Sequence, residues 1–211
     1  MAAVSVGIFG GAFDPPHVGH VELARVGTER FELDRLLVRV VEDPGHKEVS
    51  TSPQIRLFLA ELAFAPLDEA EISLDPFPRT VDSLEALALD DPVFLLGADE
   101  FAALSSWKDP ERVLALARLG VATRPGFARS RLDEVLAGLE RPDRVTFFEI
   151  EPLPVSSSEI RSRVAQGQPI DGLVPPAVRA EIDRLELYRR VDRPEDGGML
   201  RGEPTEGTTP T

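Results

Sequence analysis

An apolar strand, two glycines and a helix start follow one another at the beginning of this chain. The segment Val4–Phe9 carries no charge and predicts a strand, and Gly10 and Gly11 come directly after it. Glycine lets a ligand approach the backbone closely, because it has no side chain. A helix is expected to begin at Val18, and the N–H groups at a helix start attract phosphate. The segment therefore predicts a strand–loop–helix unit that can hold a phosphate group.

The alternation of strand and helix continues along the chain. Further strands are expected at Leu36–Val41, near Ala70–Leu74, and at Val93–Leu96, Leu119–Thr123 and Val145–Ile150. Helices are expected at Val18–Phe31, Pro53–Phe64, Thr80–Leu89, Asp109–Ala117, Arg129–Leu139, Ser156–Gln166 and Pro175–Tyr188. This order favours an α/β fold: a Rossmann-like, doubly wound parallel sheet with helices on both faces and a C-terminal helical segment. Ligands of such sheets bind at the carboxyl ends of the strands.

Composition limits the classes of function. The 211 residues suit one domain, expected over residues 1–190, and residues 191–211 are expected to form a disordered tail of mainly Pro, Gly, Glu and Thr. A net charge of −14 argues against general nucleic-acid binding. The chain has no cysteine, and neither a long apolar run nor a secretory signal pattern is visible. We therefore expect a cytoplasmic protein that binds neither nucleic acid nor membrane.

All three histidines of the chain fall in two loops that each follow an early strand. His17 and His20 lie at the expected helix start, and His46 precedes Lys47 in the second loop. Each of these residues alone is more simply explained as a cap, a turn or a surface residue. Together they place imidazoles beside a phosphate-binding loop, which favours chemistry on a nucleotide phosphate.

Five segments of the chain also match a known superfamily in the expected order. They are GIFGGAFDPPHVGH at Gly7–His20, GHK at Gly45–Lys47, RTVDSL at Arg79–Leu84, FLLGADEFAALSSW at Phe94–Trp107 and VSSSEIRSR at Val155–Arg163. The chain resembles the HxGH nucleotidylyltransferases, and the middle segments resemble the branch of bacterial nicotinate-nucleotide adenylyltransferases. The resemblance covers roughly residues 4–188 and implies the nucleotidylyltransferase fold.

The resemblance implies a reaction and its substrates. ATP would donate its adenylyl group to nicotinate mononucleotide, and the products would be deamido-NAD, an intermediate of NAD biosynthesis, and pyrophosphate. Mg²⁺ would arrive with ATP, since the sequence shows no cluster of metal ligands. Two alternatives stay open: a related transferase with another acceptor or CTP as donor, and a non-catalytic nucleotide-binding regulatory module. A homo-oligomer also stays open.

Site residues follow from the same match. The expected catalytic residues are His17, His20, Lys47 and Arg161. The expected residues that bind ATP and its phosphates are Gly10, Gly11, Phe13, Ser156, Ser157 and Ser158. The expected residues that bind the ribose or the acceptor are His46, Arg79, Thr80, Gly97, Asp99, Trp107 and Arg124.

Simpler structural roles are available for several of these residues. Ser156 and Glu159 have the spacing of a capping box, so the serine run could be no more than a well-capped helix start. The same helix start could also hold the β- and γ-phosphates of ATP, with Arg161 one turn further. Trp107 could pack in the core or stack on the pyridine ring, and Asp99 could cap a helix or bind ribose hydroxyls.

The chain departs from the family pattern at three places. Ala12 stands where the family usually has Thr or Ser, and Val40–Val41 stand where it often has Pro-Asn. Each change removes a polar contact from the site. Arg79 replaces an aromatic residue before Thr80, and its guanidinium could pair with a carboxylate or a phosphate. These departures bear on the choice of acceptor.

Overall fold

A single parallel sheet organises the computed structural model, which describes residues 4–45, 49–124, 126 and 128–189. Its six strands are β1 (Val6–Gly11), β2 (Arg35–Val41), β3 (Ala70–Asp75), β4 (Val93–Gly97), β5 (Arg118–Thr123) and β6 (Val145–Glu149). They lie in the order β3-β2-β1-β4-β5-β6, and every neighbouring pair is parallel. The order reverses direction between β1 and β4, and the crevice at such a point is where ligands of these sheets bind. The predicted fold class is confirmed.

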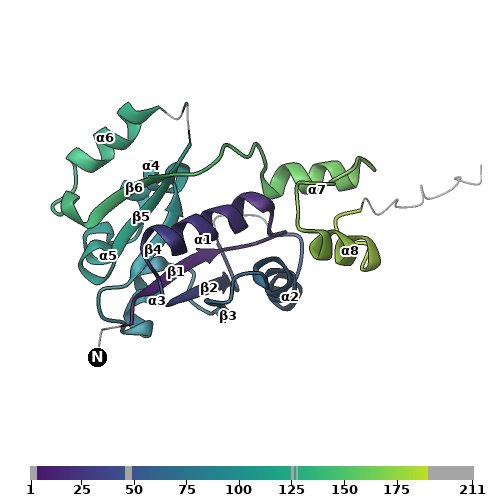
Figure 1. Cartoon of the computed structure of the whole chain (residues 1–211), viewed down its shortest axis with the longest axis horizontal. Helices are drawn as coiled ribbons and strands as arrows, with labels where there is room; N and C mark the ends of the chain where they lie inside the picture. Colours follow the sequence, from purple (N-terminus) through teal and green to yellow (C-terminus); the bar gives the residue numbers. More distant parts are fainter. Residues whose placement is uncertain (1–3, 46–48, 125, 127, 190–211) are drawn as a thin grey trace, which may run out of the picture.

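Helices cover both faces of the sheet (Figure 1). Those of the described chain are α1 (Val18–Arg30), α2 (Pro53–Phe64), α3 (Thr80–Leu87), α4 (Ala98–Ala102), α5 (Pro110–Leu116), α6 (Arg129–Ala137), α7 (Ser157–Ala165) and α8 (Pro176–Arg184), with short 3₁₀ turns at Leu104–Ser106 and Pro142–Arg144. One hydrophobic core joins the sheet to α1, α2, α7 and α8, and a second joins it to α3, α4, α5 and α6. None of these helices is long and apolar enough to cross a membrane.

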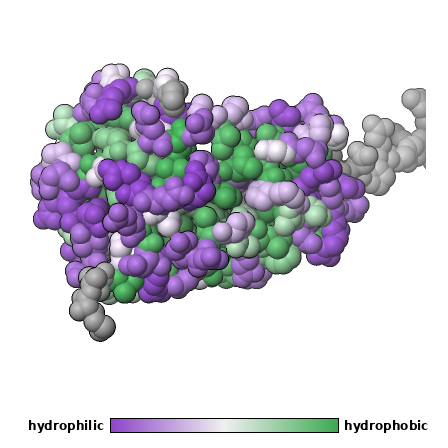
Figure 2. All heavy atoms as spheres, in the orientation of Figure 1, coloured by the Kyte–Doolittle hydropathy of each residue, from purple (hydrophilic) through white to green (hydrophobic). Residues whose placement is uncertain are grey.

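Strand β4 shows why the sheet is buried on both faces. Its residues Val93 and Leu95 belong to the first core, and Phe94 and Leu96 belong to the second. Alternate side chains of a strand point to opposite faces, so an unbroken apolar run serves both layers. Polar side chains cover most of the outer face seen in Figure 2, with apolar patches between them.

Most predicted elements are present, with shifted ends. Sequence reasoning missed the five-residue helix α4 and the two 3₁₀ turns, because a single helical turn has almost no periodicity. It placed the end of α3 at Leu89, but Ala88 adopts the left-handed conformation and stops the helix at Leu87. It also carried the last helix to Tyr188. That extension is wrong, because α8 ends at Arg184 and both Glu186 and Tyr188 have positive φ angles.

The C-terminal helices lie beyond the carboxyl end of β1. Figure 1 shows α7 and α8 together there, near the start of α1 and close to α2. The backbone N–H of Val18 donates to the carbonyl of Leu173 at 3.1 Å, which ties the first helix to this segment. The tail expected at residues 191–211 lies outside the described residues.

Candidate active site

The loop between β1 and α1 is tightly folded. Phe13 has a φ of 50°, and the peptide bond between Asp14 and Pro15 is cis. His17 then adopts the extended conformation of an N-cap, and α1 begins at Val18. The loop therefore delivers two imidazoles at the first turn of a helix, at the carboxyl end of the central strand.

His17 and His20 cap the helix reciprocally. The backbone N–H of His20 donates to Nδ1 of His17 at 3.3 Å, and the backbone N–H of His17 donates to Nδ1 of His20 at 3.2 Å. The rings are stacked, with centroids 3.6 Å apart and planes 20° from parallel. A ring that accepts at Nδ1 carries its proton at Nε2, where it is a hydrogen-bond donor.

Burial keeps His17 neutral. The residue is only 9% exposed, and burial lowers the pKa of its imidazole to about 4, because a buried charge is poorly solvated. The ring is therefore a neutral N–H donor at pH 7. The sequence analysis offered a cap as the simpler explanation of a histidine at this position, and His17 is indeed the N-cap of α1.

Phe13 does not offer its side chain to a nucleotide. Its ring is 2% exposed and packs edge-on against Phe9, His20 and Phe64. The expected contribution of Phe13 to ATP binding is thus limited to its backbone. Gly11 is required by the same packing, since a Cβ there would lie 2.9 Å from the Phe13 ring. Gly10 has more room, because a Cβ there would lie 3.6 Å from the Phe94 ring.

The start of α7 contacts the same loop. Ser156 is the N-cap, and its Oγ accepts from the N–H of Glu159 at 3.2 Å. The expected capping box is only half formed, because the Glu159 carboxylate accepts from Arg163 instead. Ser157 Oγ donates to the Pro15 carbonyl at 2.8 Å, and Arg161 donates to the Asp14 carbonyl at 2.7 Å. The structure therefore joins two helix starts, each with N–H groups that suit phosphate.

A buried arginine that sequence reasoning did not single out holds the surrounding backbone. Arg56 in α2 is 0% exposed, and its guanidinium donates to carbonyls of Ala12 at 2.8 Å, Val41 at 2.7 Å and Glu42 at 2.7 Å. Burial lowers the pKa of this guanidinium from its ordinary value, against the attraction of Asp14. A signal was present, since Arg56 lies on the same helical face as Leu59, Ala60, Ala63 and Phe64.

Asp14 is a second buried ionisable residue of this region, and the sequence analysis did not single it out. Its carboxylate is 2% exposed and accepts from the Ser50 N–H, from Thr51 Oγ1 at 2.7 Å and from the Tyr188 hydroxyl at 2.8 Å. A carboxylate with several donors can remain charged when buried. Asp14 thus connects the β1–α1 loop to the segment that leads into α2 and to the C-terminal segment.

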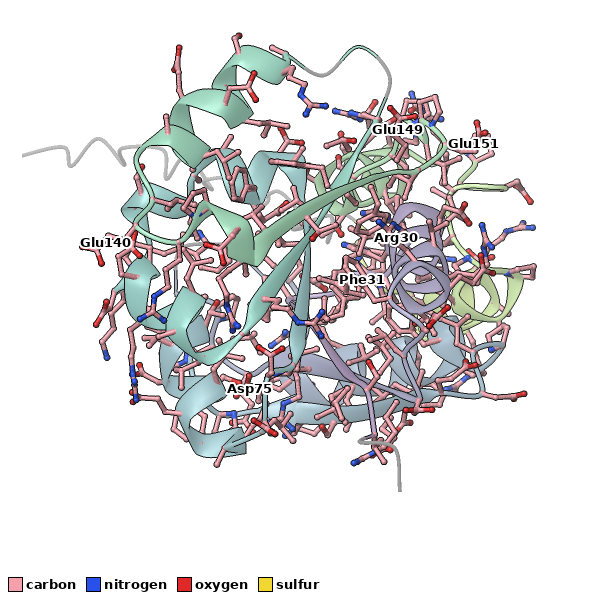
Figure 3. All side chains as sticks on the ribbon, turned by 60° about the vertical axis from the view of Figure 1, so that its left-hand side comes forward. Arg30, Phe31, Asp75, Glu140, Glu149 and Glu151 are labelled. Carbon is pink, nitrogen blue, oxygen red and sulfur yellow. The ribbon has the colours of Figure 1, made fainter. Side chains whose placement is uncertain are left out.

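Other expected residues line a pocket on the β4–β5 side. Gly97, Asp99 and Arg124 surround a cavity of about 120 Å³, together with Gly19 at the start of α1. Arg124 lies 3.9 Å from the Asp99 carboxylate, and both side chains are largely exposed. Glu151 completes the rim just after β6, and Figure 3 shows it beside Glu149. Asp99 lies in the first turn of α4, whose N-cap is Gly97.

Arg79 and Thr80 follow the edge strand β3, and Trp107 follows the 3₁₀ turn that comes after β4 and α4. Arg79 is exposed, and its side chain makes no cap hydrogen bond although it is the N-cap residue of α3, which begins at Thr80. Asp75, at the end of β3 in Figure 3, anchors this helix by accepting from Ser83 Oγ at 2.6 Å. Trp107 is half-buried and packs edge-on against Phe94, with ring centroids 6.1 Å apart. The expected packing of Trp107 in the core is therefore observed.

Two expected residues cannot be placed. His46 and Lys47 lie outside the described residues, so their distance from the histidine pair is not defined. The residues that are described contain no group of three or more His, Asp or Glu side chains that could hold a metal ion.

The fold and the paired histidines beside a second helix start define a nucleotidylyltransferase. The cytidylyltransferase-like family model matches residues 8–163. A probable nicotinate-nucleotide adenylyltransferase of Rubrobacter xylanophilus is 37% identical, over 94% of this chain and 98% of the relative, and one of Roseiflexus is 36% identical, over 90% and 100%. The chain therefore belongs to the cytidylyltransferase-like family, in its nicotinate-nucleotide adenylyltransferase branch.

Solved structures agree on the fold. Nicotinic acid mononucleotide adenylyltransferase of Plasmodium falciparum, complexed with NaAD, superposes with a TM-score of 0.72 at 19% identity, over 88% of this chain and 98% of that one. The same enzyme complexed with APC gives a TM-score of 0.71 at 18% identity, over the same shares of the two chains.

Proposed function

We infer that the protein transfers the adenylyl group of ATP to nicotinate mononucleotide, forming deamido-NAD and pyrophosphate. The observation that carries this inference is the reciprocal cap of His17 and His20, at the carboxyl end of β1 and beside the start of α7. The identities to nicotinate-nucleotide adenylyltransferases support the choice of reaction. The two histidines and the late arginine are all present, which argues against a non-catalytic module.

The reaction needs no covalent enzyme intermediate. An oxygen of the acceptor phosphate attacks the α-phosphorus of ATP and forms a new P–O bond, while the bond to the β-phosphate oxygen breaks and pyrophosphate leaves with its electrons. Catalysis then consists of positioning and charge stabilisation. We assign to His17 and His20 the donation of Nε2–H hydrogen bonds to the α-phosphate and the departing oxygens. The backbone at Gly10, Gly11 and Phe13 is proposed to contact the same phosphates.

The start of α7 is the proposed seat of the β- and γ-phosphates. Ser156, Ser157 and Ser158 form its first turn, and Arg161 follows one turn later. Ser157 and one nitrogen of Arg161 bond the loop that carries the histidines, which would hold the two proposed phosphate sites at a fixed separation. That arrangement suits in-line transfer, which requires the attacking and leaving oxygens to be aligned.

The remaining residues are proposed to bind ribose and acceptor. Gly97, Asp99 and Arg124 line one pocket, in which Asp99 can accept from ribose hydroxyls. Trp107, Thr80 and Arg79 are proposed for the pyridine side, with His46 and Lys47 contributed by the loop after β2. These residues follow different strands, which supports a ligand that extends across the carboxyl ends of several strands.

We propose that Mg²⁺ enters with ATP as part of the substrate. The Asp14 carboxylate, three residues before His17, already accepts three hydrogen bonds. Mg²⁺ keeps several waters and commonly binds through substrate phosphates, so a resident cage of carboxylates is not required.

The proposal extends to organisation and location. Residues 1–190 would act as one domain in the cytoplasm, where ATP and the pyridine mononucleotide are substrates. A homo-oligomer remains a prediction that light scattering coupled to size exclusion would test.

The decisive experiment measures pyrophosphate release from ATP and from CTP with a panel of acceptors. The panel contains nicotinate mononucleotide, nicotinamide mononucleotide, phosphopantetheine and sugar phosphates. We expect turnover with ATP and nicotinate mononucleotide, and a loss of about a hundred- to a thousandfold in His20→Ala, the usual effect of removing one donor to developing charge. Circular dichroism should show that the variant is folded. If the protein instead used another acceptor, or CTP as donor, the proposed substrates would be wrong and only the assignment to the nucleotidylyltransferases would stand.

A further inference from the structure

The segment that follows α8 contacts the loop between β1 and α1 through one tyrosine. The hydroxyl of Tyr188 donates to Oδ1 of Asp14 at 2.8 Å, across 174 positions of sequence. Asp14 is buried in the loop between β1 and α1, three residues before His17. The contact therefore links the end of the C-terminal segment to the loop that carries the histidine pair.

The backbone between the end of α8 and Tyr188 adopts an unusual conformation. After α8 ends, Glu186 has a φ of 52° and Tyr188 a φ of 62°, and the N–H of Leu187 donates to the carbonyl of Ile182 at 3.0 Å. Residues other than glycine rarely adopt positive φ, at a cost of about 1–3 kcal/mol each, and do so where surrounding contacts compensate. Two such residues within three positions indicate that the docking of Tyr188 is a specific feature of the fold.

The contact acts together with two hydrogen bonds from α7. Ser157 donates to the Pro15 carbonyl and Arg161 donates to the Asp14 carbonyl, so the C-terminal segment contacts two consecutive loop residues. Tyr188 is the member of this set that reaches a carboxylate, and hydrogen bonds to charged groups are the stronger kind. Burial and the neighbouring Asp14 raise the pKa of the tyrosine, so it stays a protonated donor at neutral pH.

We propose that Tyr188 is a positioning residue for adenylyl transfer: it holds the loop that carries His17 and His20 in register with the start of α7. The proposal rests on the function inferred above. It predicts an effect on turnover in particular, because a displacement of about 1 Å between reacting groups can cost about a hundredfold in rate. Acceptor binding, which we assign to residues that follow β3 and β4, should change little.

The test compares Tyr188→Phe with Arg184→Gln in the full chain. The first variant removes only the hydroxyl. The second removes an exposed ion pair with Glu181 on the same C-terminal segment. For Tyr188→Phe we expect kcat to fall tenfold or more, with KM for nicotinate mononucleotide within about twofold of the wild-type value, at a temperature well below Tm. Arg184→Gln should retain wild-type kcat.

Hydrogen exchange gives a second readout that does not depend on turnover. Amides of residues 12–20 and 157–161 should exchange faster in Tyr188→Phe than in the wild type, and those of β4 and β5 should not change. Wild-type kcat in Tyr188→Phe, or exchange that is unchanged in both segments, would overturn the proposal. So would equal losses of kcat in the two variants, since these would reflect stability alone. Failure of the proposed function is distinguishable, because the wild-type protein would then release no pyrophosphate.

Discussion

His17 and His20 each accept a hydrogen bond at Nδ1 from the backbone N–H of the other. Protonation of either Nδ1 would remove an acceptor from the first turn of α1. The neutral form of the pair is therefore part of the helix cap as well as of the site. Stability and the chemistry of the proposed reaction consequently depend on the same protonation state.

The burial of His17 predicts a specific dependence of stability on pH. The pKa of His17 is lowered from 6.5 in the unfolded chain to about 4, so the unfolded state binds the extra proton between these values. The contribution of His17 to the free energy of unfolding is fully present above pH 6.5. It falls as the pH drops toward 4, by about 2–3 kcal/mol between pH 7 and 4.5, at about 1.4 kcal/mol per pKa unit.

The measurement is urea unfolding of the wild type and of His17→Asn at several pH values. Asparagine also caps a helix but does not titrate. The wild type should lose more stability than the variant over this pH range, and the subtraction removes the contribution of the carboxylates. Parallel curves for the two proteins would contradict the shift.

Arg161→Lys should weaken ATP binding more than acceptor binding. Lysine cannot form the planar fork of a guanidinium, and Arg161 bonds the Asp14 carbonyl in addition to its proposed phosphate contact. Arg161→Ala should be weaker still. Calorimetric titration with a non-hydrolysable ATP analogue measures the effect, and Arg163→Lys on the same helix is a matched control whose partner is Glu159. Unchanged nucleotide affinity in Arg161→Lys would mean that the start of α7 is only a capped helix and not a phosphate site.

Arg79→Gln should reduce discrimination between the acid and the amide of the acceptor. The Arg79 side chain is exposed and makes no cap hydrogen bond, and we propose that it contacts the pyridine carboxylate. A hydrogen bond to a charged group contributes about 1.5–3 kcal/mol, so the wild type should prefer nicotinate mononucleotide at least tenfold. Values of kcat/KM for both acceptors decide the matter. A ratio that does not change in the variant means that Arg79 is not the selector.

Arg56→Met should destabilise the protein by about 3 kcal/mol or more. The substitution leaves the partly buried carbonyls of Ala12, Val41 and Glu42 without their donor, and an unsatisfied group of this kind costs about 1 kcal/mol, the lower end of the range for buried groups. Arg112→Gln, which breaks an exposed pair with Glu85, should cost less than about 1 kcal/mol. Comparable losses in the two variants, measured by urea unfolding, would show that the buried contacts are weak.

The sheet was predictable because its signals are local. The apolar run Val93–Leu96 can serve two cores only as a buried strand, and Ser52 caps α2 as its position before Pro53 suggests. The loop between β1 and α1 could be singled out as a candidate phosphate site because glycines and histidines are concentrated in one short segment. These inferences need no knowledge of which distant residues meet.

What sequence reasoning missed depends on long-range contacts. Asp14 looked like a turn residue, because its partners Thr51 and Tyr188 are 37 and 174 positions away. Phe13 looked available to the ligand, because nothing local shows that its ring is buried against Phe64. Arg56 was the exception, since the helical periodicity of α2 already placed it on the buried face.

The buried guanidinium of Arg56 makes the opening of this region an all-or-none event. Its acceptors belong to the loop after β1, the end of β2 and the approach to α2, including the Thr51 carbonyl at 3.4 Å. If one of these segments separates, a charge in the interior loses part of its solvation, which favours release of the other segments as well. The loop that carries the histidines therefore belongs to the same cooperative unfolding unit as α2, and neither is expected to fray alone.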